Sequence, residues 1–292
     1  MLNYSYPLYR PPAEANNIII QATYGCSHNS CTFCSMYKSK KYELREIEEL
    51  YKEIDTLAKA YPDAHKVFLA DGDALSLPTD YLLELLRYLK QAFSRLKRVS
   101  VYAAAQNVLE KSEEELRLLC ENGLSLIYYG IETGNDTLLK KINKGVSSSQ
   151  IIESLNKASK ARIKISATVI LGIGGETYTH EHIKDTAAII NNTTVNYLST
   201  LQLGLDDAVK EKFHRDFDGF NMLNDYQLLD EQKRFLELLS PSNKVIFRSN
   251  HASNALHLAG TLPKDNSRLI QELEEALAIG EDAMVPNMFR GF

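Results

Sequence analysis

The feature that most constrains this chain is an alternation of short apolar runs with longer segments of helical periodicity between residues 17 and 201. Runs of this length, rich in β-branched residues, are typical of buried strands, and the segments between them are long enough to be helices. Alternation of strand and helix predicts a parallel sheet with helical crossovers. The expected strands are Asn17–Thr23, His65–Ala70, Val99–Ala105, Leu124–Tyr129, Lys164–Leu171 and Asn196–Leu201.

Residues at the helix ends support this assignment. We expect Thr79 to be the N-cap of the helix Thr79–Phe93. Ser112 and Glu115 form a capping-box pattern, and Gly123 stands where a C′ glycine would end that helix. The other helices expected in this region are Glu43–Ala60, Ser147–Ala161 and His180–Asn191.

Six βα units fit either an open doubly wound sheet or a curled, incomplete barrel, and periodicity alone does not separate the two. After about residue 205 the alternation ends. We therefore expect a core of residues 1–205 and an α/β extension of residues 206–292 that covers one end of the sheet. The segments expected in the extension are a polar stretch Asp206–Asp225, a helix Tyr226–Leu239, a strand Lys244–Arg248 and a helix Asn266–Ile279.

Composition limits the classes of function. The chain has 292 residues, enough for a sizeable core, and a formal net charge of −5. A nucleic-acid-binding protein usually has a basic excess, so a nucleic-acid partner is not expected. The first residues do not form a secretory signal, and no apolar run is long enough to span a bilayer. We therefore expect a cytoplasmic protein.

The chain has four cysteines, and three of them lie within nine residues, directly after the first expected strand. Clustered thiolates in a cytoplasmic protein indicate a metal or an iron–sulfur cluster rather than disulfides. Cys26, Cys31 and Cys34 would leave one iron of a four-iron cubane without a protein ligand, and that iron could bind a small chelating molecule. Cys120 lies in a helical run and is expected to be a small buried apolar side chain.

Two other interpretations of the cysteine loop stay open at this point. A structural zinc site is commonly closed by four ligands in two pairs, and the sequence has no second pair of cysteines. A cluster that only transfers electrons normally uses four cysteines. Both alternatives therefore lack ligands that they would need.

The loop from Tyr24 to Cys34 resembles the cluster motif of the radical S-adenosylmethionine (SAM) superfamily, including the aromatic Phe33 before the last cysteine. The usual spacing in that superfamily is C-x3-C-x2-C, whereas this chain has C-x4-C-x2-C. After the second expected strand, Asp71-Gly72-Asp73-Ala74 stands where the superfamily has a Gly-Gly-Glu-like turn. The resemblance implies that the backbone at Gly72 and Asp73 receives the methionyl amine of SAM.

Two further segments extend the resemblance over roughly residues 17–203. The run from Gly130 to Gly145 is similar to that of a subgroup with the Elongator catalytic subunit, the methylthiotransferases and oxygen-independent coproporphyrinogen oxidase. The resemblance implies that Glu132 bonds the SAM ribose and that Lys144 approaches the SAM carboxylate. The stretch Thr168–Thr177 resembles a glycine-containing segment of the same subgroup, which implies that Thr168, Gly172 and Gly174 bind SAM. This stretch does not complete G-x-G-x-x-G, so it does not indicate a Rossmann dinucleotide site.

The resemblance implies a partial (β/α)6 TIM-like barrel that holds a [4Fe–4S] cluster and SAM. One electron delivered to the cluster would cleave SAM and give a radical that abstracts a substrate hydrogen. Such chemistry needs a closed cavity, and the C-terminal extension is the expected lid. Within it, we expect Arg248 and His251 to be catalytic, because the segment Arg248–Asn254 is dense in hydrogen-bonding groups. Further candidates for lining the cavity are Gln106, Asn107 and Gln202.

Three functions remain open from the sequence. The first is a radical SAM enzyme acting on a small or medium-sized molecule or a peptide. The second is a tRNA-modifying radical SAM enzyme, against which stand the missing second cysteine triad and the absence of a basic excess. The third is a non-enzymatic carrier of a metal or cluster. A flavodoxin or ferredoxin could supply the electron, docking on the basic residues that follow the cysteine loop, although a solvated face explains them equally well. These residues are Lys38, Lys40, Lys41 and Arg45.

Overall fold

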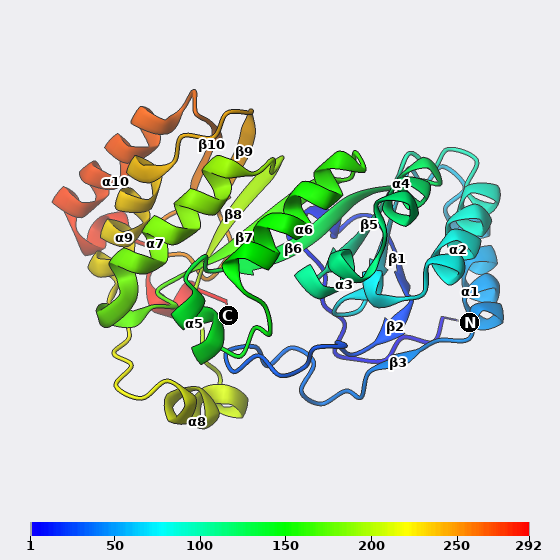
Figure 1. Cartoon of the computed structure of the whole chain (residues 1–292), viewed down its shortest axis with the longest axis horizontal. Coiled ribbons are helices and arrows are strands. Elements are labelled where there is room, and N and C mark those ends of the chain that lie inside the picture. The colour runs from blue at the N-terminus through cyan, green and yellow to red at the C-terminus, as the bar shows by residue number, and fades with distance from the viewer. Residues whose placement is uncertain (1, 292) are drawn as a thin grey trace. The chain divides into compact units, whose positions relative to one another are not determined.

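The computed structural model describes residues 2–291. Its main sheet has eight strands in the order β1-β4-β5-β6-β7-β8-β9-β10 (Figure 1). Strands β1, β4, β5 and β6 pair in parallel, as do β7, β8 and β9, whereas β10 runs antiparallel to β9. The strands are β1 (Ile18–Gln21), β4 (Lys66–Ala70), β5 (Arg98–Ala103), β6 (Leu124–Glu132), β7 (Lys164–Leu171), β8 (Tyr197–Gln202), β9 (Val245–Ser249) and β10 (Leu258–Leu262).

The fold is therefore a mixed α/β fold with a largely parallel sheet, as the alternation predicts. The described strands do not close into a complete barrel, in agreement with the expected partial (β/α)6 architecture. All six expected strands and their crossover helices are present. A two-stranded ribbon of β2 (Thr23–Tyr24) and β3 (Glu43–Leu44) accompanies the main sheet. The longer helices are α1 (Ile47–Ala60), α2 (Thr79–Ala92), α4 (Glu113–Glu121), α6 (Ser148–Lys160), α7 (Gly175–Asn192), α8 (Asp207–Asp216), α9 (Asp225–Leu238) and α10 (Asn266–Ile279).

The chain divides into two compact units. The first comprises Met1–Asn29, Ser35–Tyr129 and Asn156–Ile165, and within it α2 packs against both α1 and α4. The second comprises Ser30–Cys34, Gly130–Leu155 and Ser166–Phe292, and within it α9 packs against both α7 and α10 (Figure 1). No helix in the described part of the chain is long and apolar enough to cross a membrane.

Several local expectations are confirmed and two are wrong. The helix expected over Glu43–Ala60 starts only at Ile47, because Glu43 and Leu44 pair with β2 as strand β3. The capping box is present: the Ser112 hydroxyl accepts from the backbone of Glu115, and the Glu115 carboxylate accepts from the backbone of Ser112. Thr79 is not an N-cap, because Pro78 holds the extended cap conformation and Thr79 is already the first helical residue. Pro78 can occupy that position because its ring favours an extended backbone and the first turn needs no further donor from it.

Besides β3 and the short 3-10 helices, four elements were not expected. The short helices α3 (Ala105–Glu110) and α5 (Asp136–Lys141) follow β5 and β6 directly. The strand β10 and the helix α8 lie in the C-terminal region, α8 within the polar stretch Asp206–Asp225. Helix α8 is polar on most of its surface, and its buried side chains are Val209 and Phe213, so few apolar residues mark it in the sequence. The Asp206 side chain caps it by accepting from the backbone of Ala208 at 2.9 Å.

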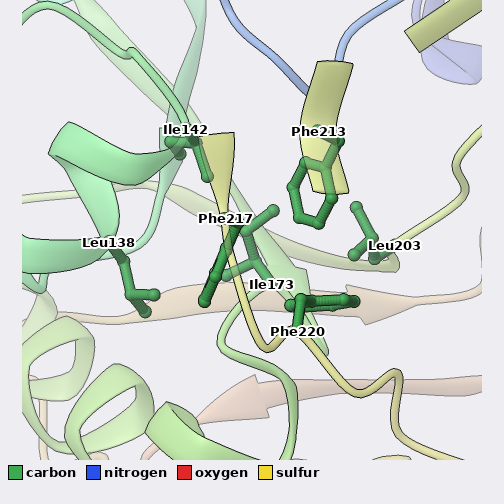
Figure 2. Close-up of a cluster of buried hydrophobic side chains, with 7 residues drawn as sticks. All are labelled: Leu138, Ile142, Ile173, Leu203, Phe213, Phe217 and Phe220. Carbon is green, nitrogen blue, oxygen red and sulfur yellow. The ribbon is translucent and has the colours of Figure 1, made fainter. Parts of the chain in front are cut away.

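Helix α8 and the residues after it are held by an aromatic cluster in the second unit (Figure 2). Phe213, Phe217 and Phe220 contact one another, with ring centroids 4.8 Å apart for Phe213 and Phe220. The same cluster includes Leu138 and Ile142 at α5 and residues that follow β7 and β8. Burial of large rings is the dominant favourable contribution to such packing.

We expect Phe213→Ala to lower the free energy of unfolding by about 3–5 kcal/mol, because it removes a fully buried ring from this cluster. Urea unfolding followed by circular dichroism measures the change. The matched control is Phe289→Ala, since the Phe289 side chain is 73% exposed. Equal losses in the two variants would show that the cluster does not stabilise the unit.

Candidate active site

The loop that carries the three clustered cysteines starts directly after β2 and ends at β3, and the pairing of these two short strands closes its base. Gly25 begins the loop with a φ of +72°, and a Cβ at this position would lie 3.1 Å from the Lys41 carbonyl oxygen. Glycine therefore lets the two ends of the loop approach. Cys26, Cys31 and Cys34 are partly exposed thiols and are not in disulfides.

A buried carboxylate at the end of β4 holds the start of this loop. The Asp71 Oδ2 atom accepts hydrogen bonds from the Gly25 backbone at 3.1 Å and from the Gln21 amide at 3.0 Å. It also forms a buried ion pair with Lys40 Nζ at 2.8 Å. A buried carboxylate needs such donors to offset its lost hydration. Asp71 thus joins residues that precede and follow the cysteines in sequence.

Asp73 holds the next part of the loop. Its Oδ1 atom accepts from the Ser27 backbone at 2.8 Å, and its Oδ2 atom accepts from the Ser27 hydroxyl and, at 3.2 Å, from the Asn107 amide. A Cβ at Gly72 would lie only 2.6 Å from Cys26 Cβ, so the backbone of the turn lies directly against the first cysteine. The structure thus places the Gly72 and Asp73 turn beside Cys26.

The second part of the loop, Ser30–Cys34, is held within the second unit. The Ser30 carbonyl accepts from the Asn143 amide at 3.2 Å, and the Thr32 backbone donates to the Ile142 carbonyl at 3.0 Å. Phe33 packs against the aromatic cluster that α8 supplies. The aromatic residue before the last cysteine therefore anchors this stretch through its ring.

Glu132 and Lys144, both predicted to bind SAM, are in contact with each other. Lys144 Nζ lies 2.7 Å from Glu132 Oε1, and both residues are buried. Glu132 ends β6 with a φ of +62°, which turns its side chain back along the strand. A Cβ at Gly130 would lie 2.0 Å from Glu132 Oε1 and 3.0 Å from Lys144 Nζ, so a larger residue there would displace the pair from this arrangement.

The turn after Glu132 is fixed by α7, a contact that sequence reasoning missed. The His182 Nδ1 atom is 2.9 Å from the Thr133 hydroxyl, and the Gly134 backbone donates to the Thr186 hydroxyl at 2.8 Å. Complete burial lowers the pKa of His182 to about 4, so the ring is neutral at physiological pH. His182 and Thr186 are four residues apart, so the sequence alone could have placed them on one face of a helix.

The glycine segment after β7 is held by a buried glutamate from α9. Gly172 has a φ of +79°, and its backbone donates to Glu231 Oε1 at 2.6 Å. The other carboxylate oxygen of Glu231 accepts from the Thr179 hydroxyl on α7. Burial raises the pKa of Glu231 to about 7, although both hydrogen bonds oppose this shift. No sequence motif had singled out Glu231.

The other predicted residues of this segment lie nearby in the chain. Thr168 is half-buried on β7 and is paired with Ser199 of β8. Gly174 is buried, and a Cβ there would lie 2.9 Å from the Tyr178 backbone, so it permits α7 to start close to the strand. Helix α7 starts at Gly175, five residues before the expected start, because these glycines hide its first turn from the periodic pattern.

A pocket of about 240 Å³ opens beside the ends of β7 and β8 in the second unit. Gly172 and Gln202, both candidates from the sequence, line it. The Gln202 amide donates to the Ser253 carbonyl at 2.6 Å and accepts from the Ala255 backbone at 3.3 Å. Gln202 thus fixes the neighbouring loop as well as lining the pocket.

The predicted catalytic residues Arg248 and His251 belong to the second unit but do not line that pocket. Arg248 is exposed on β9 and donates to the Phe247 carbonyl at 2.7 Å. His251 Nδ1 accepts from the Ser253 backbone at 3.2 Å, and burial lowers its pKa. Asn254 is buried and accepts from the Gln202 backbone at 2.9 Å. Catalytic roles for Arg248 and His251 stay a prediction.

Gln106 and Asn107, the remaining cavity candidates, lie on α3 rather than in a loop. Asn107 is buried and contacts Asp73, whereas Gln106 is half-buried. Three of the four basic residues after the cysteine loop have partners within the chain. Lys40 pairs with Asp71, and Lys38 and Arg45 also have partners within the chain. The fourth, Lys41, is exposed.

A family model of the radical SAM superfamily matches residues 20–189, more than half of the 292 residues. The chain belongs to the radical SAM superfamily. Enzymes of this superfamily bind a [4Fe–4S] cluster and SAM. Family membership thus confirms the resemblance drawn from the cysteine loop, the Glu132 segment and the glycine segment.

Individual relatives lie in the expected subgroups. The chain is 29% identical to the heme chaperone HemW of Bacillus subtilis over 46% of this chain and 36% of that protein. It is 25% identical to tRNA-2-methylthio-N(6)-dimethylallyladenosine synthase of Petrotoga mobilis over 94% of this chain and 64% of that protein. The crystal structure of coproporphyrinogen III oxidase (HemN) from Escherichia coli covers 76% of this chain and 51% of its own, with a TM-score of 0.56 and 14% identity. The chain thus spans less than two thirds of each relative.

Individual residues of this radical SAM protein have the chemistry that binding of its family's two cofactors requires. The thiols are accessible, and the backbone at Gly72 lies against Cys26, which leaves main-chain groups beside the first cysteine. Glu132 and Lys144 offer a carboxylate and an ammonium group at one position. Among residues 2–291, no three His, Cys, Asp or Glu side chains gather as metal ligands would. The assignment of the cysteines as cluster ligands therefore stays a prediction.

We expect the stability of this radical SAM protein to depend on pH through Glu231. Its pKa is raised from the ordinary value of 4.5 to about 7, so the folded chain binds a proton more tightly than the unfolded chain. The free energy of unfolding should therefore fall by about 3 kcal/mol as pH rises from 4.5 to 7 through this one group. Glu231→Gln resembles the protonated form and should lack this fall. Urea unfolding of both proteins at several pH values tests it, and parallel pH curves would contradict it.

Proposed function

We propose that this chain is a radical SAM enzyme in which Cys26, Cys31 and Cys34 hold a [4Fe–4S] cluster and which acts on a small or medium-sized substrate. The observation that carries the proposal is the contact between the cysteine loop and the Asp71–Asp73 turn, with Gly72 directly against Cys26. The bound cluster and SAM would supply a carbon radical that abstracts a hydrogen atom.

The chain's own residues would bind and orient SAM. The backbone at Gly72 and Asp73 would receive its amine next to the first cysteine. Glu132 and Lys144 neutralise each other in the structure, so each would exchange part of this contact for a polar group of SAM. Thr168, Gly172 and Gly174 would line its nucleoside half, where glycine allows close approach of the backbone. Residues 206–292 would exclude water, with Arg248 and His251 as polar groups toward the substrate.

A tRNA substrate is a second candidate, because the Petrotoga mobilis relative is a tRNA-modifying enzyme and its similarity extends over 94% of this chain. The net charge of −5 favours the first candidate, since binding to phosphates is driven by basic residues. Gel-shift titration with unfractionated tRNA at low salt separates the two. A shift at micromolar protein would favour tRNA modification.

The electron would come from an acidic flavodoxin- or ferredoxin-type protein. Lys41 is the exposed member of the basic residues after the cysteine loop and is the contact that we propose for it. Lys40 is not proposed as a contact for this partner, because its buried ion pair with Asp71 holds the loop.

We expect Cys26→Ala, Cys31→Ala and Cys34→Ala each to abolish the four-iron cluster after anaerobic reconstitution with iron and sulfide. Cys120→Ala is the matched control, because Cys120 lies on α4 and burial raises the pKa of its thiol, which disfavours the thiolate. Iron analysis and the visible absorption spectrum measure cluster content. A full cluster in any of the first three variants would remove that residue from the ligand set.

We expect Glu132→Gln and Lys144→Met to weaken SAM binding by about one to two decades, the usual loss for one charge-assisted hydrogen bond. Cluster content should stay that of the parent. Because each change leaves a buried partner charge, the double variant is measured as well, and thermal unfolding checks the fold. Lys160→Met is the control, since the Lys160–Glu113 pair is exposed. SAM affinity equal to that of the parent in both single variants would contradict the assignment.

A further inference from the structure

The pocket beside β7 and β8 is completed by the C-terminal tail of the chain. Its walls come from the ends of the two strands, from the first turn of α9 and from the short 3-10 helix Asn287–Phe289 with the residue that follows it. The lining residues are Gly172, Gln202, Leu203, Met222, Leu223, Asn224, Asp225, Leu228, Asn287 and Arg290. All of them belong to the second unit.

The tail is fixed in this position by backbone and side-chain contacts. The Val285 backbone donates to the Ala255 carbonyl at 2.7 Å, and the Gly291 backbone donates to the Ala252 carbonyl at 3.2 Å. Arg290 Nε donates to the Val285 carbonyl at 2.7 Å. These bonds lie on both sides of Asn287 and Arg290, so the tail forms a defined wall of the pocket.

One ion pair dominates the electrostatics of the pocket. Arg290 Nη1 and Nη2 donate to the two carboxylate oxygens of Asp225 at 2.7 and 2.8 Å, which is a bidentate pair. The Arg290 side chain is only 3% exposed, whereas that of Asp225 is 30% exposed. The guanidinium is therefore enclosed and its donors are engaged, while the carboxylate keeps lone pairs that a ligand can reach.

Asp225 is also held rigidly. It is the first residue of α9, and the Asn224 side chain caps that helix by accepting from the Gln227 backbone at 3.0 Å. The Gln227 side chain in turn accepts from the Asn224 backbone at 2.8 Å. A carboxylate placed in advance loses little entropy when a ligand binds it.

Charge and shape together select a class of ligand. Asp225 offsets the charge of Arg290, and Glu231 lies behind the pocket through its bond to the Gly172 backbone, so the pocket carries no net positive charge. The remaining walls include three leucines and a methionine. A group that donates hydrogen bonds and is positively charged matches Asp225, and an alkyl or ring portion matches the apolar walls.

We propose that this pocket binds a small molecule with a protonated amino group, which contacts Asp225, and with an apolar body that lies against Leu203, Leu223 and Leu228. This inference rests on the proposed function in one respect, which is that such an amine is taken to be the substrate class of the enzyme. Binding at the amine site needs neither the cluster nor SAM to be present, although Gly172 lines this pocket and is also proposed to contact SAM. Arg290 is the internal counter-ion of Asp225 and holds the tail in place through its bond to the Val285 carbonyl.

The test uses the full chain as purified, without cluster reconstitution, and three probes of matched size: n-hexylamine, n-hexanol and hexanoate. Ligand-observed NMR titration measures each affinity. We expect hexylamine to bind roughly tenfold or more tightly than the other two, because only it forms a charge-assisted hydrogen bond with Asp225. Equal affinities, or a preference for hexanoate, would overturn the proposal without any variant.

Two variants locate the preference. Asp225→Asn should reduce hexylamine binding to the level of hexanol, whereas Asp230→Asn should leave it unchanged. Asp230 lies on the same helix but pairs with Arg234 and does not line the pocket. Thermal unfolding confirms that each variant is folded. An unchanged preference for hexylamine in Asp225→Asn would overturn the assignment of Asp225. If the chain binds hexylamine selectively but does not cleave SAM, the amine site is supported and the proposed function is contradicted.

Discussion

Two buried carboxylates at the end of β4 determine how the cysteine loop is arranged in the first unit. Asp71 accepts from the Gly25 backbone and Asp73 accepts from the Ser27 backbone, on either side of Cys26. Because buried carboxylates need several donors, the loop and the turn stabilise each other. The single glycine between them, Gly72, lets the main chain approach Cys26. The hydrogen bonds of this turn and its close packing therefore both depend on Asp71, Gly72 and Asp73.

In the second unit, Glu132 and Lys144 are likewise buried charged groups that stabilise each other. A buried ion pair contributes little net stability unless its geometry is good, yet removing one partner leaves an uncompensated charge. Here the pair is compact because Gly130 leaves the required space and Glu132 adopts a left-handed backbone conformation. His182 then fixes the following turn from α7 while staying neutral. Residues far apart in sequence thus hold one short segment.

Much of this arrangement could be predicted from the sequence, and the rest could not for identifiable reasons. The strands and the Ser112 capping box depend on local patterns, which periodicity and capping signals report. The sequence predicts that Glu132 and Lys144 both bind SAM, but it does not predict their contact, because the resemblance gives no distances. Glu231 and the Asp225–Arg290 pair had no local signal, since their partners lie far away in the chain. Helix α8 was missed because most of its residues are polar and its buried side chains are Val209 and Phe213.

The position of Phe33 has a consequence for local unfolding. Its ring packs against the cluster that Phe213, Phe217 and Phe220 form, one residue before Cys34. Detachment of α8 in a transient opening would remove these contacts and release the chain around that thiol. Amide hydrogen exchange in α8 and the rate at which Cys34 reacts with oxygen or alkylating agents should then follow the same opening equilibrium. The lifetime of an oxygen-sensitive site would be governed by a helix that contributes no ligand to it.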